Sequence, residues 1–273
     1  MKKIAASIIC FALAATHPLR AQLSAPAAGT FPSLTAPAPA PAAKAPAGPI
    51  PADPAQAFAA GLAAYEKNDF DQARALFSAA EGKAISAPLE YNFGNTCFQA
   101  ADYGGAVLHY LRSLTLDPRD PDSLQNLALA RRSTNLVIAD PTRLENFAGL
   151  LSLNTWAGLA TLAGWAALYL AFLPGLYRWR GIVPKLLCAT AAIIALSTGI
   201  GYWAAHQHVH DGVVLHADTA VQLSPTANSP AIGLVQSGEV AQTLDEHGGY
   251  FKVRTADGRL GWVEAANFSP VWN

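Results

Sequence analysis

Of the residue types that can bind a metal, the histidines at positions 206 and 210 have the spacing most similar to that of a metal site. His206 and His210 stand four positions apart and share one face if the chain is helical there, so both imidazoles can reach one metal ion. The alternative is a polar collar of histidines where the chain leaves a membrane. The sequence favours the collar, because it has no histidine–carboxylate spacing typical of metal sites. We therefore expect no bound metal and no cofactor.

The cysteines offer no catalytic nucleophile, because a nucleophilic thiol needs a base within hydrogen-bond reach. Cys97 falls in a helical repeat and Cys188 in a long apolar run, and neither has a histidine beside it. Cys10 lies in an N-terminal apolar stretch, so the three thiols also cannot form a disulfide framework. A glycine-rich phosphate-binding loop is absent from the sequence as well. We predict that the protein is not an enzyme and has no catalytic residues.

Two apolar runs, 153–176 and 186–205, dominate the centre of the chain. About 20 apolar residues in a helix span a bilayer. The charges between the runs are Arg178, Arg180 and Lys185, all in the loop 177–185, and short basic loops stay in the cytoplasm. Buried helices of a soluble protein are the alternative, but both runs are apolar on every side. We predict a transmembrane hairpin within 150–206, in contact with lipid, and no transporter, because the runs lack ionisable residues.

The N-terminal segment predicts export. Lys2 and Lys3 precede a short apolar stretch, which is typical of a signal peptide, here 1–21. Residues 22–54 are rich in alanine and proline and predict an extended linker. Export of the N-terminus agrees with the basic loop of the hairpin. Together they predict a multi-pass protein of the bacterial inner membrane with its N- and C-terminal domains in the periplasm.

Residues 55–139 repeat a helical pattern with a period of 33. Gly61, Ala73 and Phe77 recur as Gly94, Ala106 and Tyr110. The pattern resembles the tetratricopeptide repeat, with units 55–87 and 88–121 and a capping helix at 122–137. That resemblance implies a peptide-binding groove, which here would contain Tyr91, Asn95, Phe98, Gln99 and Gln125. In the alternative, the asparagines Asn92, Asn95 and Asn126 only form hydrogen bonds with helix backbones and with neighbouring repeats.

Residues 211–273 change to the period of two that is typical of strands. Asp257-Gly258 lies between two such runs and predicts a hairpin turn. The stretch from Tyr250 to Val263 is similar to bacterial SH3-like domains, which implies a small all-β barrel. Tyr250, Lys252 and Arg254 alternate onto one strand face, which we predict to be the exposed contact surface. Trp262 shares a face with Leu260 and is predicted to be core.

The sequence as a whole predicts a multi-domain membrane protein with an all-α tetratricopeptide solenoid, a two-helix transmembrane hairpin and a small all-β SH3-like barrel. It resembles the BatE-like proteins of bacterial aerotolerance operons, on the stretches 91–95, 116–132, 153–156 and 258–263. The resemblance implies membrane partners of the Bat type that carry von Willebrand A-type domains. A net charge of −1 without a basic stripe predicts no nucleic-acid partner.

We expect a non-enzymatic scaffold linked to stress or oxygen tolerance that displays two protein-binding modules in the periplasm. The alternative is a membrane anchor whose SH3-like domain binds peptidoglycan or wall peptides.

Overall fold

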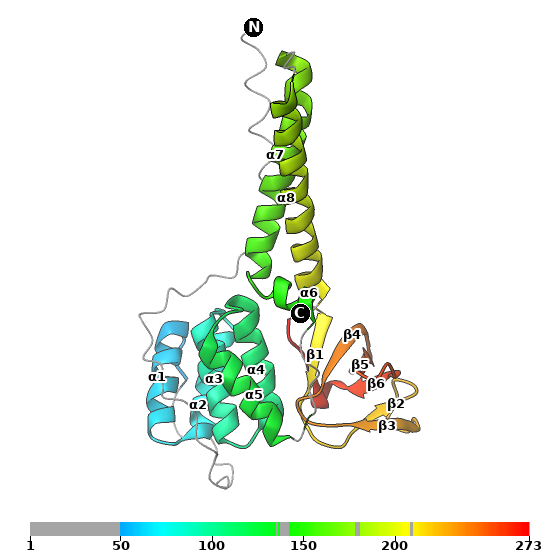
Figure 1. The fold of residues 1–273 in the computed structure, drawn as a ribbon. Coiled ribbons are helices and arrows are strands. Elements are labelled where there is room, and N and C mark those ends of the chain that lie inside the picture. Colours follow the sequence, from blue (N-terminus) through cyan, green and yellow to red (C-terminus); the bar gives the residue numbers. More distant parts are fainter. Residues whose placement is uncertain (1–49, 135, 137–141, 178–180, 208–209, 273) are drawn as a thin grey trace.

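The computed structural model describes residues 50–134, 136, 142–177, 181–207 and 210–272. Its described part contains eight α-helices and one antiparallel sheet. A helical domain (α1–α5) and a sheet domain (β1–β7) lie side by side at the base of a long two-helix hairpin (Figure 1). The expected signal peptide 1–21 and nearly all of the expected linker 22–54 lie outside the described residues.

Five helices build the helical domain, and each begins at a polar capping side chain. Asp53, Asp69, Ser86, Asp102 and Asp120 each accept a hydrogen bond from a backbone N–H in the first turn of the helix that follows. The helices are α1 (Pro54–Glu66), α2 (Phe70–Glu81), α3 (Ala87–Gln99), α4 (Tyr103–Leu116) and α5 (Pro121–Ser133). Local sequence therefore sets where every helix of this domain starts.

Glycines at equivalent positions let the paired helices approach closely. A Cβ atom added at Gly61 would lie 2.6 Å from the Phe77 ring, and one added at Gly94 would lie 2.7 Å from the Tyr110 ring. Both rings are fully buried. The 33-residue period of the sequence thus corresponds to the same ring-on-glycine contact in α1–α2 and in α3–α4.

The hairpin consists of α7 (Leu153–Tyr177) and α8 (Ile182–Gln207), which pack along each other (Figure 1). Large apolar side chains such as Leu162, Phe172 and Leu196 are about two-thirds exposed along both helices. Among the described residues, these two helices are long and apolar enough to cross a membrane. The short helix α6 (Arg143–Ala148) closes the foot of the hairpin, where the Trp156 indole N–H donates to the Ala148 carbonyl at 2.8 Å.

Seven short strands form the sheet in the order β3-β2-β6-β5-β4-β1-β7, with antiparallel neighbours throughout. Their core contains six small apolar side chains and one ring: Val214, Val221, Val235, Ala241, Val253, Val263 and Phe268. The strands are β1 (Asp211–Val214), β2 (Thr219–Gln222), β3 (Ala231–Val235), β4 (Val240–His247), β5 (Tyr250–Arg254), β6 (Leu260–Glu264) and β7 (Phe268–Pro270).

The sheet domain shares a hydrophobic core with the helical domain. Val213 of β1 and Val271 after β7 are buried in the same cluster as Val107 of α4. Backbone packing is close here too, because any side chain at Gly104 would clash with the Leu215 backbone. The two domains therefore form one packed body.

Candidate functional site

The exposed side of strands β5 and β6 carries aromatic and charged side chains in register. Tyr250 lies opposite Glu264, Lys252 opposite Trp262, and Arg254 opposite Leu260. Because side chains on a strand alternate between faces, these residues share one face, which we call the outer face, while Phe251 and Val253 point to the core. The outer face is the candidate binding surface.

A cation and an indole meet at the centre of the outer face. The Lys252 ammonium lies 5.9 Å from the centroid of the Trp262 ring, within the range of a cation–π interaction. Trp262, Lys252 and Tyr250 are each half-buried, so part of each side chain stays accessible on the outer face. Glu264 opposite Tyr250 and Asp245 opposite Lys252 add carboxylates at the edge of this group. Such a surface can pack against an apolar or sugar surface and pair with charges of both signs.

The prediction that Trp262 belongs to the core is wrong. Trp262 is half-buried and Leu260 is 49% exposed, whereas Gly261 and Val263 point inward. Gly261 occupies an inward position because any larger residue would press on Val221 and the Gln222 backbone. Glycine adds no hydrophobic residue to the inward face of β6. The opposite face, with Leu260 and Trp262, therefore seemed from the sequence to be the more apolar one and was predicted to be core. The structure moves Trp262 to the same face as Lys252.

The prediction that Tyr250, Lys252 and Arg254 share a face is confirmed by the strand register. Arg254 is exposed, and its Nη1 donates to Gln242 Oε1 at 3.1 Å. Their role in binding stays a prediction. Sequence reasoning missed Trp262 as the fourth member, and the alternation of residues 260–264 around Gly261 was the signal that could have found it.

The residues predicted to form a groove on the helical repeats are mostly inside the domain. Phe98 is 0% exposed, Asn95 1% and Tyr91 6%, which contradicts their assignment as exposed contact residues. Asn95 Oδ1 accepts hydrogen bonds from the Tyr110 hydroxyl at 2.8 Å and from Asn126 Nδ2 at 3.0 Å. Asn95 and Asn126 thus join neighbouring helices, and Asn92 Nδ2 donates to the Pro88 carbonyl of its own helix, as in the alternative interpretation.

Of the same predicted set, Gln125 is exposed and Gln99 is half-buried. Only these two side chains remain as surface positions of the predicted groove. Aromatic and amide side chains on a helix can belong to the core or line a ligand groove, and their spacing in the sequence does not separate the two.

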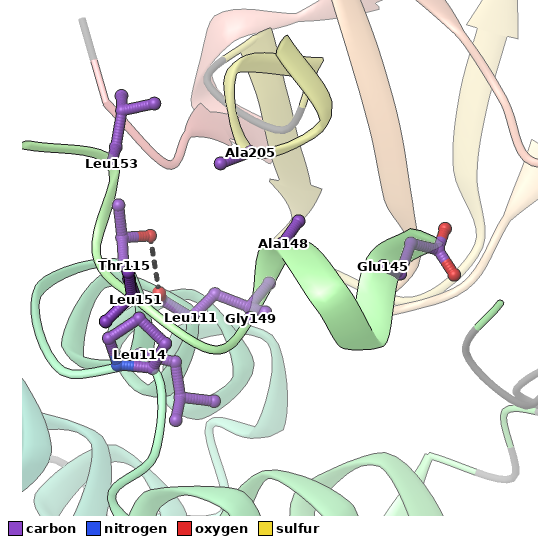
Figure 2. Close-up of a pocket in the computed structure, with 10 residues that line it drawn as sticks. Leu111, Leu114, Thr115, Glu145, Ala148, Gly149, Leu151, Leu153 and Ala205 are labelled. Atoms are coloured by element: carbon purple, nitrogen blue, oxygen red, sulfur yellow. Dashed lines mark hydrogen bonds between the residues drawn. The ribbon is translucent and has the colours of Figure 1, made fainter. Parts of the chain in front are cut away.

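A cavity of about 190 Å³ lies between α4 and the foot of the hairpin (Figure 2). Most of the residues that line it are apolar, and Glu145 is the charged residue among them. Its lining includes Leu111, Leu114, Thr115, Pro118, Glu145, Ala148, Gly149, Leu151, Leu153 and Ala205. The cavity suits an apolar group and offers no arrangement of side chains for a reaction.

The histidines and cysteines singled out in the sequence have ordinary surroundings. The rings of His206 and His210 pack edge to face with centroids 5.8 Å apart. Among the described residues, no group of three ligand-type side chains includes either histidine. Burial raises the pKa of the Cys97 thiol, so it stays protonated, and the Cys188 thiol donates to the Leu170 carbonyl at 3.0 Å.

Comparison with known families adds one finding. The bacterial SH3 domain family matches residues 222–269, which run from the end of β2 into β7 and include the outer face. No curated protein and no solved structure matches the chain. The C-terminal sheet domain is therefore similar to bacterial SH3 domains in sequence and consistent with them in its antiparallel strands.

Proposed function

We propose that this protein is a membrane-anchored, non-enzymatic binding protein of the bacterial envelope, whose outer face binds peptidoglycan or wall peptides. The observation that carries this proposal is the group formed by Tyr250, Lys252 and Trp262 within the segment that matches bacterial SH3 domains. Bacterial SH3 domains are often peptidoglycan-binding modules, and the outer face presents two aromatic rings, those of Tyr250 and Trp262.

The chemistry of the outer face suits such a ligand. Wall peptides carry free carboxylates that pair with Lys252 and Arg254, and amines that pair with Asp245 and Glu264. The Trp262 and Tyr250 rings offer apolar surface to sugars and aliphatic side chains, and such aromatic anchors carry much of the energy of an interface.

We place the hairpin in the inner membrane and the packed body in the periplasm. Support comes from the length of α7 and α8, from the apolar side chains exposed along them and from the basic residues between them. Peptidoglycan lies in the same compartment, so this location brings the outer face to its ligand.

We also propose a scaffold role for the helical domain. Two equivalent ring-on-glycine contacts support reading α1–α4 as two tetratricopeptide units and α5 as their capping helix. In this reading the protein joins a membrane assembly of the Bat type, with proteins that carry von Willebrand A-type domains as partners. Gln99 and Gln125 are the members of the predicted groove that a partner can still reach.

Co-sedimentation of the detergent-purified full chain with isolated cell-wall sacculi tests the wall-binding function. We expect Trp262→Ala and Lys252→Gln each to weaken binding at least about tenfold, because truncation of an interface anchor costs about 2 kcal/mol or more. Arg119→Ala is the control, since Arg119 is exposed on the turn between α4 and α5. Equal sedimentation of all variants would exclude the outer face as the wall-binding site.

Cross-linking of the native membrane protein, followed by mass spectrometry, tests the scaffold role. Capture of proteins with von Willebrand A-type domains is the expected result. Capture that is limited to wall fragments would remove the scaffold and leave the anchor.

A further inference from the structure

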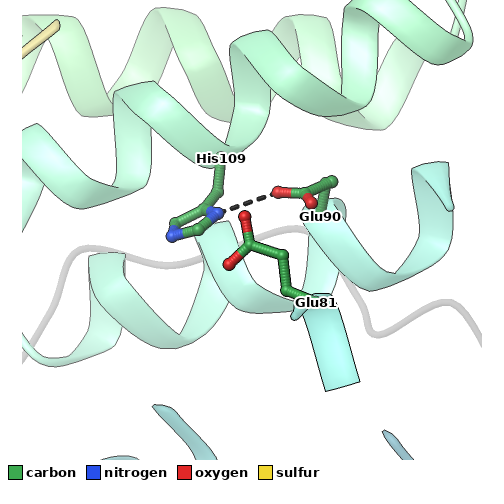
Figure 3. Close-up of side chains that lie close together, drawn as sticks. All are labelled: Glu81, Glu90 and His109. Atoms are coloured by element: carbon green, nitrogen blue, oxygen red, sulfur yellow. Dashed lines mark hydrogen bonds and ion pairs between the residues drawn. The ribbon is translucent and has the colours of Figure 1, made fainter. Parts of the chain in front are cut away.

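Three ligand-type side chains from three helices meet in the helical domain (Figure 3). Glu81 is the last residue of α2, Glu90 lies in the first turn of α3, and His109 lies on α4. One ligand atom of each lies within 4.8 Å of the others. Glu90 Oε2 and His109 Nδ1 lie 2.8 Å apart. We call this group the Glu–His cluster.

The buried carboxylate of the cluster is incompletely satisfied. Glu90 is 0% exposed, and its Oε1 is buried with no hydrogen-bond partner among the described residues. A carboxylate without full compensation in a protein interior costs free energy, so buried carboxylates normally are paired or coordinate a metal. The lone pairs of Glu90 Oε1 are therefore available to a bound cation.

The neighbours of the cluster hold its side chains in position. The His109 ring stacks on Phe93 with centroids 3.7 Å apart, which fixes its orientation. Arg112 Nη1 donates to Glu81 Oε1, while Arg112 Nε and Nη2 donate to the carbonyls of Val271 and Pro270. Carboxylates that bind metals are usually oriented by a further hydrogen bond of this kind.

We propose that Glu81, Glu90 and His109 bind a divalent transition-metal ion such as zinc. Two carboxylate oxygens and one imidazole nitrogen are a donor set that zinc accepts, with a fourth position left for water. The two carboxylates outnumber the guanidinium of Arg112, and the nearby Arg74 is paired with Asp102, so the ionised cluster attracts a dication. The Glu81 side chain is 21% exposed and gives the ion a route of entry. The proposal does not depend on wall binding by the outer face.

A neutral hydrogen-bonded pair is the competing account of the same atoms. Burial raises the pKa of Glu90 to about 7 and lowers the pKa of His109 to about 3, so the metal-free cluster favours a protonated carboxyl that donates to a neutral imidazole. A metal ion would replace that proton between the same lone pairs. Sequence spacing did not indicate this site, because Glu90 and His109 are 19 positions apart on different helices.

Zinc binding to the full chain in detergent, stripped with EDTA beforehand, tests the proposal. We expect one zinc per chain by elemental analysis after dialysis, and loss of more than about tenfold in affinity in Glu90→Gln and in His109→Gln. The matched controls Glu264→Gln and His216→Asn remove an exposed carboxylate and an exposed imidazole, and should bind zinc like the parent chain. Zinc that is retained in Glu90→Gln but lost in His206→Asn/His210→Asn would overturn the proposal and move the ion to the end of α8.

A readout on the unmutated chain covers the case in which Glu90→Gln fails to fold. Co²⁺ added to the stripped protein should give visible absorption bands of a four- or five-coordinate ion, and stoichiometric zinc should abolish them. A spectrum identical to that of cobalt in buffer would show that the cluster is the neutral pair, and the proposal would fail.

Discussion

Arg112 on α4 donates from Nε to the backbone carbonyl of Val271 at 2.7 Å, although the two residues stand 159 positions apart in the sequence. The same guanidinium lies 5.6 Å from the Trp272 ring and also binds Glu81. Arg112 therefore joins α2 and α4 to the segment that follows the last strand. The helical and sheet domains are expected to unfold together, because their shared core and this side chain both cross the boundary.

Arg112→Ala should lower the free energy of unfolding. Hydrogen bonds to charged groups contribute about 1.5–3 kcal/mol each, and the variant removes three such bonds while leaving two carbonyls and a carboxylate to find other partners. Urea denaturation of the full chain in detergent, followed by circular dichroism, measures the change. Arg119→Ala should shift the free energy of unfolding by less than about 0.5 kcal/mol. Equal midpoints for the two variants would mean that Arg112 does not join the domains.

Gly94→Ala should destabilise the helical domain by about 1–3 kcal/mol through overpacking. The new Cβ would lie 2.7 Å from the ring of Tyr110, which is fully buried and cannot easily move. Gly82→Ala is the matched control, because its Cβ would meet the Ser78 and Ala79 carbonyl oxygens at the ordinary contact distances of 3.6 and 3.9 Å. Thermal melts of both variants measure the difference. A normal melt for Gly94→Ala would show that the ring-on-glycine contact is not tight.

Stability of the metal-free protein should depend on pH through the Glu–His cluster. Below pH 4.5 the unfolded chain binds the extra proton at His109, so stability falls as the pH drops toward 3. Between pH 4.5 and 6.5 both states hold one proton, on Glu90 when folded and on His109 when unfolded, and stability is level. From pH 6.5 to about 7 the folded state holds the extra proton on Glu90, so stability falls as the pH rises.

Glu90→Gln should change this profile in a defined way. Without the carboxyl, only His109 contributes, and stability should rise steadily from pH 3 to 6.5. Urea midpoints measured in EDTA across this range separate the two profiles, with Glu264→Gln as the control for loss of one carboxylate. A plateau that persists in Glu90→Gln would show that burial does not lower the pKa of His109 in the folded protein.

Membrane orientation is testable with single cysteines in a background that lacks Cys10, Cys97 and Cys188. Gly181→Cys lies in the basic loop and should resist a membrane-impermeant thiol reagent in intact spheroplasts, because positively charged loops stay in the cytoplasm. Ala227→Cys lies in the exposed loop between β2 and β3 and should react. The reverse labelling pattern would place both domains in the cytoplasm and exclude wall binding.

Periodicity of the sequence predicted the elements better than it predicted their exposed residues. The repeat of Gly61 and Phe77 as Gly94 and Tyr110 indicated the helix pairs, because a ring needs a glycine to pack against at this distance. Which side of α3 faces a ligand was not predictable, since that helix is buried from Leu89 to Phe98 by its neighbours on all sides.

The same limit applies to contacts between residues that stand far apart in the sequence. Nothing local in the sequence indicates that Arg112 reaches Val271, or that His109 lies beside Glu90. These contacts depend on how the helices stack and where the sheet packs against them. Trp262 was misplaced for a local reason, because Gly261 takes an inward position without contributing to the apolar pattern.

The hairpin is joined to the packed body at both of its ends, because α6 precedes α7 and β1 follows α8 in the chain. A body held by two chain segments cannot rotate freely about its attachment, as a domain on a single flexible linker can. In the proposed membrane location, the sheet domain is therefore expected to keep a restricted orientation relative to the bilayer. A pull on the outer face would then be transmitted along the backbone into α8.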